Sequence, residues 1–162
     1  LPTTKRWPLE NFNALLEEFS KKNIQCVLIG DEGDMIMVRG INVTLKNVKS
    51  IIGKTSISDL INIINKSIGV ICHDSGIMHL SVALDVNTLV LVGPSNLDKI
   101  KPHSSNCKII HLDVPCSPCL LGWDGLGWGE AESVEKCEHN NYCMKDIGPE
   151  MVFDEAKMFF EF

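Results

Sequence analysis

The stretch IGVICHDSGIMHLSVALDVNTLVLVG, residues 68–93, decides the fold of this 162-residue chain. It contains two short, continuously apolar runs, 68–72 and 88–93, and a segment with helical periodicity between them, 76–85. Strands that are apolar on both faces are typical of a parallel sheet covered by helices on each side. The stretch therefore predicts a strand, a crossover helix and a second, parallel strand.

The same alternation extends over the rest of the chain. Apolar residues at helical spacing follow Pro8, and Ser56 or Ser58 is a suitable cap for a second helix. Further strands are expected at 26–30 and 107–114, and a final helix at about 149–161. Residues 31–49 are ambiguous, 115–147 form an irregular Cys- and Gly-rich segment, and 50–56 read as an apolar run and a turn. We predict one α/β domain over residues 1–162, with a doubly wound, mostly parallel, Rossmann-like sheet.

Composition excludes two classes of function. The chain carries 15 Lys and Arg against 21 Asp and Glu, a net charge of -6, which argues against a general nucleic-acid binder. No apolar run approaches the roughly 20 residues that span a bilayer. The chain opens LPTTKRWP, without a signal peptide and on Leu rather than Met, so we expect a fragment of a longer protein.

The seven cysteines bear on compartment and on metal binding. Their odd number excludes complete internal pairing, and Cys26 and Cys72 lie in apolar runs, which favours a reducing, cytoplasmic setting. Later in the chain, a C-x2-C pair and the long gap after it suit a structural zinc site, whereas the C-x5-C spacing of the second pair is loose for one, with His139 as a substitute ligand. Disulfides and free thiols are the alternatives for this group, which comprises Cys116, Cys119, Cys137 and Cys143.

Polar residues follow the first strand of the opening stretch, where parallel sheets bind ligands. Ser75 is a plausible helix N-cap, and the unpaired amides of the first turn form a seat for an anion such as phosphate. Gly76 allows close approach, and His79 lies on the same side of the helix as Ser75. Asp74 could accept hydrogen bonds from sugar hydroxyls. The alternative is ordinary helix capping with nothing bound, and a histidine at a helix–sheet contact.

Two further segments offer ligand-binding chemistry. Asp31 and Glu32 follow the strand at 26–30, where a carboxylate can bind both hydroxyls of a ribose, although an acidic surface turn has the same pattern. Thr3, Thr4 and Lys5 offer hydroxyls and a charge for phosphate, or else a frayed terminus. A P-loop and a G-x-G-x-x-G dinucleotide motif are both absent from the sequence.

Six segments in this order resemble the carboxyl-terminal half of glycosyltransferase family 9, the ADP-heptose:lipopolysaccharide heptosyltransferases. They are TTKRWPLENFNALL (3–16), VLIGDEGD (27–34), GKTSISDL (53–60), CHDSGIMHLSVALDV (72–86), LVLVGPSN (89–96) and CSPC (116–119). The resemblance implies one half of a GT-B fold, in which two Rossmann-like domains enclose the active site. This chain would be the half that binds the nucleotide-sugar donor.

The resemblance also implies roles for individual residues. The diphosphate would be bound by Thr4, Lys5, Ser75, Gly76 and His79. The ribose would be held by Glu32, the adenine would lie against Thr55, and the sugar hydroxyls would bind Asp74. The implied reaction is inverting transfer of a heptose from ADP to a lipopolysaccharide-core acceptor, without a required cofactor.

The family's general base belongs to an amino-terminal domain that this sequence lacks, so the chain alone should bind donor without catalysing transfer. The resemblance implies a full-length protein in the bacterial cytoplasm that can associate peripherally with the inner membrane. Two other functions stay open: a non-catalytic Rossmann-like interaction module that could bind zinc, and another NDP-sugar enzyme of GT-B type. The final helix carries a large apolar set, part of which should be exposed if a partner domain is missing. This set comprises Met151, Val152, Met158, Phe159 and Phe160.

Overall fold

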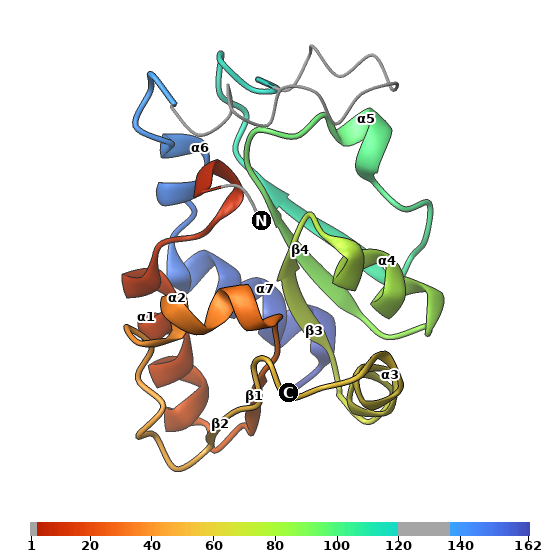
Figure 1. Ribbon diagram of the computed structural model, residues 1–162. Helices are drawn as coiled ribbons and strands as arrows, with labels where there is room; N and C mark the ends of the chain where they lie inside the picture. Colours follow the sequence, from red (N-terminus) through yellow and green to blue (C-terminus); the bar gives the residue numbers. More distant parts are fainter. Residues whose placement is uncertain (1–2, 120–136) are drawn as a thin grey trace.

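The computed structural model describes residues 3–119 and 137–162, and within them every strand pairing is parallel (Figure 1). The strands form a two-stranded sheet of order β1-β2 and a three-stranded sheet of order β3-β4-β5. Their bounds are β1 Cys26–Leu28, β2 Val48–Ser50, β3 Val70–His73, β4 Thr88–Val92 and β5 Cys107–His111. The parallel sheet predicted from the sequence is therefore confirmed.

Helices connect successive strands and close the chain. The α-helices are α1 Leu9–Lys21, α2 Met35–Val38, α3 Ile57–Asn65, α4 Gly76–Ala83, α5 Leu97–Ile100, α6 Tyr142–Lys145 and α7 Pro149–Phe160. Two single 3₁₀ turns, η1 Thr3–Lys5 and η2 Glu32–Asp34, precede α1 and α2. Ser56 begins α3 with a reciprocal capping box to Asp59, which settles the choice between Ser56 and Ser58.

Strand β4 shows why the sheet is doubly wound. All five of its residues are buried, and its side chains alternate between two cores. Leu89 and Leu91 pack in the core formed with α1, α6 and α7, whereas Val90 and Val92 pack with Met78 of α4. Helices therefore cover both faces of the central strand, as the continuous apolar run 88–93 predicts.

The first strand departs from the prediction. Residues 26–30 were expected to form a buried strand, but β1 ends at Leu28 and Val27 is 45% exposed. In the described residues β1 pairs with β2 in a two-stranded sheet, and the exposed Val27 lies between two half-buried residues, so one face of β1 meets solvent. The partner strand β2, at 48–50, was not predicted, because three residues are too few to show the alternation of apolar and polar side chains that is typical of a strand.

Helix α7 packs on α1 through Val152 and Ala156, which are fully buried. On its other side, Met151 is 44% and Met158 is 64% exposed, so the expected exposure of part of this apolar set is confirmed. Among the residues described, no helix is long and apolar enough to cross a membrane.

Candidate functional site

The carboxyl ends of β3 and β4 bring three polar side chains together. The carboxylate of Asp74 lies directly after β3, and its Oδ2 accepts hydrogen bonds from Lys5 Nζ at 2.6 Å and Ser95 Oγ at 2.7 Å. Ser95, in the turn after β4, is buried, while the Lys5 and Asp74 side chains are 19% and 11% exposed. A partly buried ion pair in this setting is held more firmly than one on the surface, because water screens it less.

The front of α4 is open next to this ion pair. Ser75 occupies the N-cap position with extended backbone, and its side chain makes no capping hydrogen bond. Gly76 is exposed, and a Cβ built on it would meet nothing within 4 Å. The Met78 amide bonds back to the Ser75 carbonyl, so the Gly76 and Ile77 amides are the ones that helix geometry leaves without a partner in α4. Ser75 therefore holds the N-cap position, as predicted, but its side chain does not cap α4 in this conformation.

His79 lies one turn further along α4 and is exposed. The helix dipole adds partial positive charge at the front of α4, and the Lys5 ammonium group supplies a full charge on the strand side. Together these groups form an open, polar seat that suits an anion with several oxygen atoms.

The N-terminal strap, residues Thr3–Trp7, crosses the end of β3 and carries Lys5. Thr4 of this strap is buried, and its Oγ1 has no hydrogen-bond partner among the described residues. In this conformation the Thr4 hydroxyl is out of a ligand's reach, because it is buried. Its contact with a diphosphate therefore stays a prediction that requires the strap to shift.

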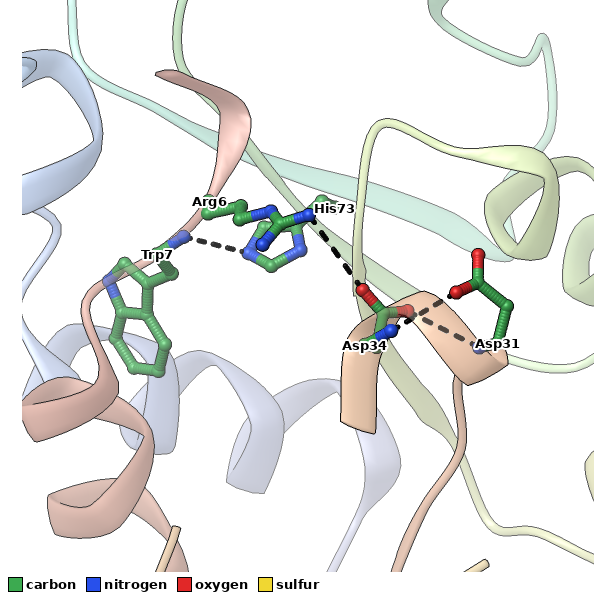
Figure 2. A network of polar contacts seen from close by, with 5 residues as sticks. All are labelled: Arg6, Trp7, Asp31, Asp34 and His73. Carbon is green, nitrogen blue, oxygen red and sulfur yellow. Dashed lines mark hydrogen bonds and ion pairs between the residues drawn. The ribbon is translucent and has the colours of Figure 1, made fainter. Parts of the chain in front are cut away.

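His73, the last residue of β3, holds the strap through a hydrogen bond to its backbone. Its Nε2 accepts a hydrogen bond of 3.0 Å from the Trp7 backbone N–H (Figure 2). Its ring also meets Phe12 edge-on. Burial, and after it the positive charge of Arg6, lower the pKa of His73 to about 4. The imidazole is thus neutral near pH 7, as an acceptor at Nε2 requires.

The predicted nucleoside residues lie on two loops that touch each other. Glu32 is exposed in η2, and Thr55 is partly buried in the turn after β2. Between them, Gly53 adopts a φ of +69°, and a Cβ there would lie 3.3 Å from the Glu32 Cα and 3.2 Å from Met35 Sδ. The Gly53 amide also bonds to the Gly30 carbonyl at 3.0 Å, which closes the two loops together.

Arg6 connects these loops to the strap. Its guanidinium lies 4.0 Å from Asp34 of η2, and Asp34 in turn shares a capping box with Asp31 (Figure 2). Neither Arg6 nor His73 is predicted as a site residue from the sequence. Two features of the sequence could have pointed to them: Arg6 stands next to Trp7 in KRWP, and His73 directly precedes Asp74.

The cysteine group surrounds α6. Cys116 Sγ lies 3.3 Å from the Tyr142 hydroxyl, Cys137 Sγ accepts from the Asn141 amide, and Cys143 is buried. Burial, followed by the other three thiols of the group, raises the pKa of Cys143 to about 11.

All seven cysteines of the chain are free thiols in the structure. Within 3–119 and 137–162, no three ligand side chains are already placed to hold a metal ion. Part of the Cys- and Gly-rich segment, residues 120–136, lies outside the described residues. The zinc site therefore stays a prediction.

Comparison with known proteins gives matches to a family, to individual sequences and to solved structures. The family model described as glycosyltransferase family 9 (heptosyltransferase) matches residues 2–124. Lipooligosaccharide heptosyltransferase 2 of Campylobacter jejuni is 29% identical over 160 residues, which are 96% of this chain and 46% of that protein.

Two solved structures share the fold. The glycosyl transferase family 9 protein of Veillonella parvula superposes with a TM-score of 0.77 at 23% identity, over 98% of this chain and 43% of its own. The structure of E. coli ADP-heptose lps heptosyltransferase II superposes with a TM-score of 0.76 at 22% identity, over 99% of this chain and 43% of its own. The chain thus spans less than half the length of these relatives and has the fold of one part of a GT-B protein, as predicted.

Proposed function

Because this chain belongs to glycosyltransferase family 9, we propose that it is the donor-binding part of an inverting glycosyltransferase. The donor is ADP-heptose or a related ADP-sugar, and the acceptor is a sugar of the lipopolysaccharide-core type. The names of the relatives support this assignment, since they describe heptosyltransferases and one names ADP-heptose. The acceptor site and the general base belong to a second domain outside these 162 residues, so this part binds donor without transferring the sugar.

The observation that carries the proposal is the Lys5–Asp74 ion pair beside the open front of α4. The diphosphate binds the Gly76 and Ile77 amides and draws the Lys5 ammonium group away from Asp74. The Asp74 carboxylate is then available for hydroxyls of the donor sugar, with Ser95 still holding one of its oxygens. Ser75 and His79 complete the diphosphate site, and Thr4 joins it if the strap moves.

The nucleoside lies on the neighbouring loops. Glu32 is exposed at the start of η2 and accepts hydrogen bonds from the ribose hydroxyls. Thr55 lies in the adjoining turn and contacts the adenine. The close approach at Gly53 fixes the spacing of these two loops, and therefore the distance between the ribose and base contacts.

The role of this part in the reaction is electrostatic stabilisation of the departing group. As the bond between the sugar and ADP breaks, negative charge grows on the departing diphosphate. Lys5 and the α4 amides are already in place for that charge, and preorganised donors of this kind contribute a few kcal/mol to lowering a barrier. No cofactor is needed for this role. We place the protein in the cytoplasm, with peripheral membrane association through the lipid-linked acceptor.

Titration calorimetry with ADP, GDP and UDP tests the proposal. We expect ADP to bind, and Lys5→Met to weaken the binding about tenfold, the size of one charge-assisted contact. The matched control is Lys21→Met, because Lys21 is exposed and pairs with Glu18 of the same helix, so its removal should not change ADP binding. No heat with any of the three nucleotides at millimolar concentration would favour the interaction-module function instead.

A further inference from the structure

The N-terminal strap is held by two consecutive residues at the end of β3. His73 accepts the Trp7 backbone N–H at 3.0 Å, and Asp74 accepts the Lys5 ammonium group at 2.6 Å. The two contacts are made two residues apart on the strap and one residue apart on the sheet. The position of Lys5 over the site is therefore linked to the contact that His73 makes.

Trp7 is a fixed point on the strap. Its indole is 1% exposed, its Nε1 donates to the Ile147 carbonyl at 2.8 Å, and its ring packs edge-on against Phe12 at 5.0 Å. The side chain of Trp7 is thus anchored in the core between α1 and α7. Within the described part of the chain, the bond to His73 ties the Trp7 backbone to β3, and two residues of chain reach at most about 7 Å from there to Lys5.

His73 is well suited to this task. Its ring is packed against Phe12, and it accepts through Nε2 only while it is neutral, the state in which burial keeps it near pH 7. Figure 2 shows the Trp7 amide directed at His73, with Arg6 and Asp34 on the adjoining side. The neutral imidazole thus adds no charge to a site that already contains Lys5, Arg6 and Asp74.

We infer that His73 is a positioning residue for diphosphate recognition: through the Trp7 backbone it sets the place of Lys5 between Asp74 and the front of α4. This inference rests on the proposed function and deepens it, because it concerns the same site. His73 itself does not touch the ligand. Its loss should therefore weaken binding of the diphosphate and leave binding of the nucleoside unchanged.

The test compares ADP with adenosine, by NMR titration or calorimetry, in four proteins: wild type, His73→Phe, Lys5→Met and the double variant. Phenylalanine keeps the ring and its packing on Phe12 but has no acceptor. We expect His73→Phe to weaken ADP binding about tenfold and adenosine binding less than about twofold. In the Lys5→Met background, His73→Phe should change ADP binding by less than about twofold, since the two substitutions act through one contact.

Two further variants separate positioning from stability. His73→Gln offers an amide oxygen in place of Nε2 and should restore most of the ADP affinity. Ile64→Ala, in the core between α3 and α4, should destabilise the fold and leave the ratio of ADP to adenosine affinity unchanged. If His73→Phe does not fold, His73→Met takes its place.

Equal loss of ADP and adenosine binding, or an undiminished effect of His73→Phe in the Lys5→Met background, would overturn the inference. Failure of both apolar variants to fold would also overturn it, because the role of His73 would then be structural. A wild-type chain that binds ADP no better than adenosine contradicts the proposed function itself, and so is distinguishable from failure of this inference.

Discussion

The buried imidazole of His73 predicts a specific loss of stability in acid. Its pKa falls from the ordinary value of 6.5 to about 4 in the folded chain, first because of burial and then because of Arg6. Asp34 and Asp74 act in the opposite direction, but less strongly. The folded state therefore keeps His73 neutral over a pH range in which the unfolded state already binds a proton.

The sign and the magnitude follow from this difference. Below about pH 6.5 the unfolded chain gains a proton that the folded chain refuses, so the free energy of unfolding decreases as the pH falls, until His73 also protonates near pH 4. From about pH 7 to pH 5 the loss attributable to His73 is about 2 kcal/mol. For a chain of this size, that corresponds to a decrease in Tm of about 4–8 °C.

Urea denaturation followed by circular dichroism at about pH 7 and pH 5 measures the effect. Carboxylates also titrate in this range, so the informative quantity is the difference between wild type and His73→Gln, which cannot protonate but retains an acceptor for Trp7. The matched control, His79→Gln, makes the same replacement at an exposed histidine of α4. If wild type and His73→Gln lose the same free energy within about 0.5 kcal/mol, the account of His73 is wrong.

Three further predictions concern the remaining parts of the site. Gly53→Ala should lower stability by about 1 kcal/mol or more and weaken adenosine binding, because its Cβ meets the backbone of Glu32 at positive φ; unchanged adenosine affinity would contradict the spacing role. Ser95→Ala should cost about 1–3 kcal/mol in thermal unfolding, since it removes a buried donor from the Asp74 carboxylate; a neutral effect would show that this bond is dispensable. The zinc prediction at the cysteine group requires about one zinc per chain by elemental analysis and its loss in Cys119→Ser; a metal-free protein with seven titratable thiols would refute it.

The fold could be predicted because its decisive signals are local. The stretch 68–93 shows two apolar runs and a helical period in one continuous segment, and the Ser56 capping box is encoded within four residues. Strand β2 could not be predicted in this way. Its three residues, 48–50, are too few to show an alternation of apolar and polar residues, and its pairing partner β1 is distant in the sequence.

The candidate site was predicted residue by residue, but its internal contacts were not. Lys5 and Asp74 are predicted from the sequence as ligand-binding residues, yet their mutual ion pair depends on tertiary structure that joins positions 69 residues apart. The burial of Thr4 and the environment of His73 arise in the same way, from the strap folding over the end of β3. Strand-end residues can thus be identified from a pattern, whereas their ionisation and accessibility require the packed structure.

The central claim is that the open front of α4 binds the diphosphate of an ADP-sugar. Titration of the ¹⁵N-labelled chain with ADP tests it most directly, because each backbone amide reports separately. The account predicts saturable shifts that are largest at the Gly76 and Ile77 amides, accompanied by a change at the Lys5 side chain. Saturable shifts confined to other surfaces, or no shifts at millimolar ADP, would contradict it.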